Sequence, residues 1–93
     1  MDDPASAPIV YDLSRSWTRC WEKVLPEENV YRYYLLILEQ NLWGEWELIR
    51  RWGRIGQGST RALLQVVDSP AAAEQLAAGI DRVRQKRGYV RRD

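Results

Sequence analysis

The sequence has no histidine, no phenylalanine and a single cysteine, Cys20. Without imidazole, a Ser-His-Asp or Cys-His nucleophile arrangement is excluded, as is any zinc site that needs a histidine ligand. One cysteine can form neither an internal disulfide nor a cysteine-rich metal site, which is consistent with a reducing compartment. We therefore expect no bound metal, and enzymes with these nucleophile arrangements are excluded.

Long apolar segments are also missing. No apolar run approaches the ~18 residues of a membrane span, and no cationic N-terminus leads into a signal-peptide core. The glycines match neither phosphate-binding pattern, since Arg61 follows Thr60 where a phosphate-cradling lysine would be required. These absences predict a cytoplasmic protein with no membrane contact and no cofactor.

One carboxylate pair has the spacing of acid-base catalysis. Glu45 and Glu47 lie two residues apart, which places both on one face of a strand. Exposed strand carboxylates are mostly solvated, so the plainer interpretation is a polar strand face. We expect no enzymatic activity.

The composition fits one small globular domain. Of the 93 residues, 45% are hydrophobic, which is enough for a packed core at this length. Residues 1–14 are expected to be a flexible lead-in, and residues 15–93 the single domain. The formal net charge is only +1, but residues 48–67 contain four arginines and no acidic residue, and a second basic stretch runs from Arg82 to Arg92.

Hydrophobic patterning predicts an α+β fold, a small antiparallel meander with one C-terminal helix across it. The largely apolar segment 30–39 is typical of a central strand covered on both faces, and the alternating segment 45–52 of its hairpin partner. Further strands are expected at 19–25 and 61–67. We expect the glycines from Gly53 onward to break the third strand.

The helix has clear start and stop signals. Ser69 is the expected N-cap, with Pro70 at the first helical position. Leu76, Ile80 and Val83 would share one helical face, and Gly88 would end the helix in the left-handed conformation.

The segment Trp52-Gly53-Arg54 carries a resemblance to a known family. The chain resembles the WGR domain, which is named after this tripeptide. The resemblance includes four further segments: Asn29 with Arg32-Tyr33-Tyr34, Leu42-Trp43-Gly44-Glu45-Trp46, Ala72-Ala73, and Lys86-Arg87-Gly88-Tyr89. It departs from the usual pattern in the loop Gly56-Gln57-Gly58-Ser59, where family members more often have two residues between the glycines.

The resemblance implies a non-catalytic, DNA-binding module. Members are known from DNA-dependent poly(ADP-ribose) polymerases, and similar domains occur alone in bacterial proteins. There the motif tryptophan packs on sugar at a DNA end or nick, and the motif arginine contacts neighbouring domains. By position these roles fall on Trp52 and Arg54, with Gly53 between them.

Arginine side chains could hold the DNA backbone without reading its sequence. We expect Arg50 and Arg32 to bind phosphates, with Arg50 on the same strand face as Trp52 and Arg51 on the other. The additional candidate phosphate contacts are Arg51, Arg61, Lys86 and Arg87.

Structural roles remain open for the same residues. Trp52 could be a core side chain. Arg54 could bond loop carbonyls or a carboxylate, and the arginines near the C-terminus could be a solvated helix end. The alternative function is a protein-protein interaction adaptor that does not bind DNA.

Overall fold

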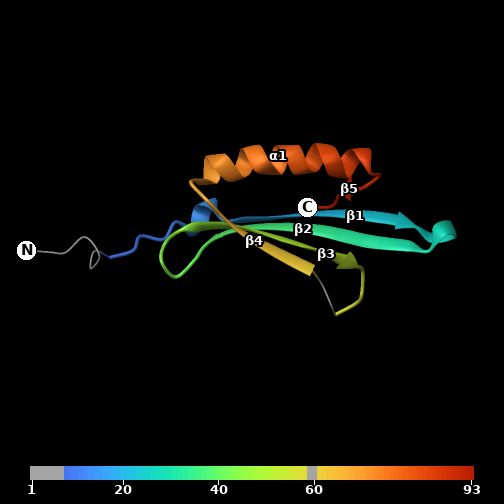
Figure 1. Ribbon diagram of the computed structural model, residues 1–93, viewed down its shortest axis with the longest axis horizontal. Coiled ribbons are helices and arrows are strands. Elements are labelled where there is room, and N and C mark those ends of the chain that lie inside the picture. The colour runs from blue at the N-terminus through green and yellow to red at the C-terminus, as the bar shows by residue number, and fades with distance from the viewer. Residues whose placement is uncertain (1–7, 59–60) are drawn as a thin grey trace, which may run out of the picture.

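The computed structural model describes residues 8–58 and 61–93. Within them a five-stranded antiparallel sheet carries one α-helix along one side (Figure 1), which confirms the predicted α+β fold. The strand order is β4-β3-β2-β1-β5. The elements are η2 (Leu13–Arg15), β1 (Trp17–Leu25), η3 (Pro26–Glu28), β2 (Val30–Gln40), β3 (Trp46–Arg54), β4 (Arg61–Val67), α1 (Pro70–Lys86) and β5 (Val90–Arg91).

The strand predictions are confirmed except at their ends. β1 begins two residues earlier than expected, and β2 is the central strand. The expected break at Gly53 is wrong, because β3 continues to Arg54. Gly53 pairs with Tyr33 and Arg54 with Arg32, so the ladder holds the glycine in extended conformation. The chain turns only at Gly56, which has a φ of +82°.

The helix begins and ends as predicted. Ser69 Oγ accepts a hydrogen bond of 3.1 Å from the Ala72 N–H, and Gly88 adopts a φ of +86° just beyond the last turn. Of the three residues predicted for the packed face, Leu76 and Ile80 pack against the core and Val83 does not. Ala73 and Ala77 are buried with Ile80 beside them, whereas Val83 is exposed. The small alanines let α1 lie close to the bulky sheet side chains.

The core lies between α1 and the sheet. Its largest buried side chains are Trp21, Leu36, Leu38 and Leu48, from the three inner strands. The Trp21 indole N–H donates a hydrogen bond of 2.8 Å to Asp81 on α1, and Arg19 forms a two-pronged ion pair with Glu74 on the same helix. These polar contacts fix the position of α1 along the sheet.

Part of the predicted lead-in contacts the domain. Residues 1–7 lie outside the described residues. The Tyr11 hydroxyl donates to the Leu42 carbonyl oxygen at 2.8 Å, and the Asp12 N–H donates to Gln40 Oε1 at 2.6 Å. This segment therefore lies beside the β2–β3 turn. Across residues 8–58 and 61–93, no helix has both the length and the apolar character needed to cross a membrane.

The two faces of the sheet have different surroundings. Trp21, Tyr34 and Trp52 are neighbours in the register and lie on the face that α1 covers. We call the opposite side the open face, because α1 does not cover it; among the described residues, only Leu13 of η2 borders it, beside Ile37 and Glu39. β2 is therefore covered by α1 on one face only, not on both as expected. Its inner positions are Cys20, Leu35, Ile37, Ile49, Arg51, Leu64 and Val66.

Candidate nucleic-acid interface

Trp52 lies on the helix-covered face of β3, near the C-terminal end of the strand. We call this end of the sheet the signature end, because the tripeptide Trp52-Gly53-Arg54 lies there. Its ring stacks on that of Tyr34, its partner in β2, with centroids 6.0 Å apart and planes 13° apart. Tyr34 in turn meets Trp21 edge-on. Trp52 is partly buried and packs against the core, but it keeps an accessible surface. It therefore packs against the core and is also partly accessible to solvent.

A recess of about 300 Å³ opens beside the indole. We call it the basic recess, and its lining residues are Tyr34, Arg50, Trp52, Leu63, Arg84 and Arg87. Three of the six are arginines and none is acidic. Aromatic rings beside unopposed guanidinium groups favour a ligand that carries negative charge and a flat or apolar group.

Arg50 is partly buried in the basic recess. It lies on β3 between Leu36 and Leu63, under α1, and its Nη2 donates a hydrogen bond of 3.0 Å to Gln65 Oε1. Its Nε is buried, and no atom in the described part of the chain accepts its hydrogen. A partly desolvated cation with an unused donor is stabilised by an anion that reaches it.

Arg84 and Arg87, at the C-terminal end of α1, line the same basic recess. The Arg84 guanidinium carbon lies 4.6 Å from the Tyr34 ring centre and 5.0 Å from that of Tyr89. Both arginines follow Leu76 and Ile80 on the sheet-facing stripe of the helix, at the 3.6-residue period. The C-terminal helix dipole favours positive charge at this end.

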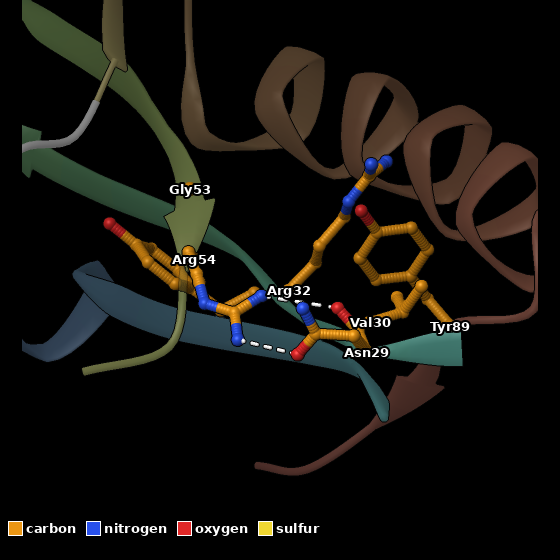
Figure 2. Close-up of a pocket in the computed structure, with 7 residues that line it drawn as sticks. Asn29, Val30, Arg32, Gly53, Arg54 and Tyr89 are labelled. Atoms are coloured by element: carbon orange, nitrogen blue, oxygen red, sulfur yellow. Dashed lines mark hydrogen bonds between the residues drawn. The ribbon is translucent and has the colours of Figure 1, made fainter. Parts of the chain in front are cut away.

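The signature tripeptide borders a neighbouring pocket of about 360 Å³ (Figure 2), whose lining residues are Asn29, Val30, Arg32, Tyr33, Gly53, Arg54 and Tyr89. Arg54 donates to the Asn29 carbonyl oxygen at 3.2 Å and to Asn29 Oδ1 at 3.1 Å. Asn29 has a φ of +56°, in the left-handed region. Arg54 therefore holds the turn that leads into β2, which is the structural role left open by the sequence.

Arg32 extends from β2 toward Tyr89 at the end of the helix (Figure 2) and is exposed. Tyr89 borders the signature pocket and also lies against Arg84, which lines the basic recess. The two pockets are therefore joined through Arg84 and Tyr89. Together they form one positively charged strip on the helix side of the sheet, at its signature end.

The remaining candidate phosphate contacts lie in three different positions. Arg61 is exposed and lies opposite Trp52 in the β3–β4 register, so it can extend the strip. Arg51 lies on the open face, away from Trp52, as its strand position predicts. Lys86 is exposed and lines neither pocket, and the helical period points it away from the sheet.

Arg84, Tyr34 and Tyr89 line these two pockets but are not among the site residues predicted from the sequence. A signal for Arg84 was present, because it continues the spacing of Leu76 and Ile80 on one helical face. No local pattern could assign the two tyrosines, since their role depends on how the helix end crosses β2.

Nearby acidic side chains are held by other groups. The hydrogen bond from the Trp21 indole, with a second one from Gln85, lowers the pKa of Asp81 below its ordinary 3.8. The Arg19 guanidinium lowers the pKa of Glu74 mainly by hydrogen bonding. Hydrogen bonding to Arg91, helped by the Cys20 N–H, lowers the pKa of Asp93 to about 2. These carboxylates stay ionised at neutral pH and are bound to partners outside the basic recess.

The sequence model of the WGR domain matches residues 17–93, most of the chain. The chain belongs to the WGR domain family. The predicted resemblance is thereby confirmed, and WGR domains are non-catalytic modules associated with nucleic-acid binding.

A relative of this WGR protein is known by sequence. The chain is 36% identical over 79 residues to uncharacterized protein y4dW of Sinorhizobium fredii (strain NBRC 101917 / NGR234). The similarity covers 83% of this chain but only 37% of that protein, so the relative is much longer than the matched domain. No solved structure is significantly similar to the chain.

Proposed function

We propose that this WGR domain binds DNA at ends or nicks, without sequence preference, and has no catalytic activity of its own. The observation that carries the proposal is the basic recess, where Trp52 lies beside three arginines with no carboxylate among the lining residues. The DNA would bind on the helix-covered face of the sheet, at the signature end.

Trp52 would supply an apolar contact to an exposed sugar or unpaired base. Tyr34 already covers one ring face, so Trp52 offers its exposed edge and remaining surface rather than a free ring. Stacking of a base on an aromatic side chain contributes ~1–3 kcal/mol in other single-strand binders, and this partial contact belongs at the lower end. Such a contact is favoured at a terminus or a nick, because the stacking face of a base and the end face of its sugar are covered by the next nucleotide inside a continuous duplex.

The arginines would hold phosphates on either side of this contact. Arg50, Arg84 and Arg87 line the recess, with Arg32 and Arg61 at its margins. About four phosphate contacts would give a slope near −3 to −4 when the logarithm of affinity is plotted against that of salt concentration. Because the net charge is only +1, binding depends on this local cluster and not on overall attraction.

Fluorescence anisotropy tests the proposal directly. The purified protein is titrated with nicked, 5′-phosphorylated blunt-ended and end-blocked continuous duplexes at two salt concentrations. We expect tighter binding to the nicked and open-ended duplexes, loss of that preference in Trp52→Leu, and weaker binding in Arg87→Ala. Lys86→Ala is the matched control, since it removes the same charge one residue away on the outer side of the helix.

Equal weak binding to all three duplexes, or equal effects of Arg87→Ala and Lys86→Ala, would contradict the proposal. A protein-interaction adaptor is the second candidate, and the β2–β3 turn favours it. Leu42 and Trp43 there are 80% and 74% exposed, far from the basic recess. Absence of DNA binding under all conditions would favour this second function.

A further inference from the structure

We propose that the open face of the sheet is a dimer interface, on which a second copy of this chain docks face to face about a two-fold axis. Its apolar residues lie between two charged groups of opposite sign. This inference does not rest on DNA binding, because the open face and the basic recess lie on opposite sides of the sheet.

The centre of the open face is an apolar row. Ile37 on β2, Ile49 on β3 and Leu64 on β4 are direct neighbours in the register. Ile49 is only 8% exposed because its neighbours crowd it, but Leu64 is 57% exposed and nearby Val66 is 53% exposed. Contiguous apolar surface of this kind on a sheet face marks an interaction site.

An acidic group lies at one end of this row. Glu39 and Glu47 are directly opposite each other on β2 and β3. Asn41 Nδ2 donates to Glu47 at 2.8 Å, but neither glutamate takes part in any ion pair formed between described residues. Like charges opposite each other destabilise a sheet, so a cation placed over them is favourable.

A cation that forms no ion pair with the described residues lies at the other end. Arg51 is exposed between Leu35 and Ala62, and no carboxylate within residues 8–58 and 61–93 pairs with it. Glu47 and Arg51 are each two residues from Ile49 along β3, one toward either end of the strand. Each is therefore about 7 Å from the apolar row.

This spacing selects one mode of self-association. A two-fold axis perpendicular to β3, passing over Ile49, places two copies of β3 antiparallel across the interface. Glu47 of each copy then faces Arg51 of the other, with the two apolar rows in contact between them. A two-fold axis parallel to the strands would instead set like charges against each other, which disfavours that arrangement.

The size of the face predicts the strength of the contact. Four strands at ~4.8 Å spacing and seven paired residues at ~3.4 Å give a projected area of roughly 450 Å² per copy, or about 900 Å² in total. Specific complexes below about 1,200 Å² are weak or transient. We therefore expect a dimer whose dissociation constant lies in the micromolar to submillimolar range.

Sedimentation velocity over protein concentrations from about 1 μM to about 1 mM brackets this range. The wild-type protein should pass from monomer to dimer. Glu47→Arg and Arg51→Glu should each weaken self-association by about tenfold or more, because each places like charges across the axis. Arg82→Glu, on the outer side of α1, is the charge-reversal control and should dimerise like the wild type.

Mixing the two variants gives the decisive result. In a heterodimer of Glu47→Arg with Arg51→Glu, the two arginines of one copy face the two glutamates of the other, so the mixture should dimerise more tightly than either variant alone. Leu64→Lys, at an exposed position, provides a second disruption if either charge variant fails to fold by circular dichroism. A wild type that stays monomeric, or a dimer that none of these changes weakens, would overturn the proposal.

Discussion

The rings of Tyr34 and Trp52 lie parallel across β2 and β3, with centroids 6.0 Å apart, so the signature tryptophan is partly supported from within the core. The same indole lines the basic recess. Stability and the proposed DNA binding would therefore depend on the same side chain, and substitutions can separate the two contributions.

Trp52→Leu keeps an apolar side chain but removes the indole ring and part of the volume. We expect the free energy of unfolding to fall by about 1–2 kcal/mol, through loss of the stacked pair and some buried area. DNA-end preference should be lost at the same time. Urea unfolding and duplex titrations on the same sample measure both effects. A larger stability loss with unchanged DNA binding would assign Trp52 to the core alone.

The hydrogen bond between Trp21 and Asp81 predicts a pH dependence of stability. Asp81→Ala leaves the fully buried indole N–H without its acceptor and should cost about 1–2 kcal/mol at neutral pH. Asp81→Asn retains an acceptor oxygen but lacks the charge, so its cost should be smaller.

The sign of the pH effect follows from the lowered pKa of Asp81. Its stabilising contribution is complete above the ordinary pKa of 3.8 and is lost as the pH falls through the lower folded value. The stability difference between wild type and Asp81→Asn should therefore narrow below about pH 4. Urea midpoints across an acid pH series measure it, and a gap that widens in acid would contradict the assignment.

Arg54 is predicted to act on the turn at Asn29. Arg54→Lys keeps the charge but cannot reach both Asn29 oxygens with one planar group. We expect a stability loss of about 1 kcal/mol, with DNA affinity reduced much less than by Arg87→Ala. Hydrogen exchange at residues 29–31 should increase. Equal losses of affinity in Arg54→Lys and Arg87→Ala would instead indicate that Arg54 contacts the ligand.

Gly88 and Gly58 allow a comparison between a conformationally constrained glycine and an unconstrained one. Gly88 has a φ of +86°, and an added Cβ would lie 3.3 Å from Lys23 Cε, whereas an added Cβ at Gly58 meets no atom within 4 Å. Gly88→Ala should destabilise the protein by about 1 kcal/mol or more, and Gly58→Ala should be close to neutral. Thermal unfolding compares them, and equal shifts would mean that the left-handed turn is not required.

Much of the fold was accessible from the sequence because its signals are local. Residues 30–39 are apolar on both faces, and Ser69-Pro70 marks the helix start by hydrogen-bonding chemistry alone. Gly53 was misread because its intrinsic freedom suggested a break, whereas pairing with Tyr33 keeps it in the strand. Tertiary pairing, which no local window contains, decided its conformation.

The candidate site was predictable only in part for a similar reason. Strand alternation placed Arg50 with Trp52 and set Arg51 apart. The meeting of Arg84 with Tyr34 depends on where the helix end crosses the sheet, which the sequence pattern does not specify. Long-range geometry also assigned Arg54 to Asn29, 25 residues away.

Trp43 affects how binding to this domain can be followed by intrinsic fluorescence. At 74% exposure it is the one solvent-exposed indole among the five, while Trp21 is fully buried and Trp17, Trp46 and Trp52 are partly buried. Its emission is a constant background, at the turn opposite the signature end of the sheet. Trp43→Phe removes that background without altering a strand, so that quenching on addition of DNA reports mainly on the indole beside the arginines.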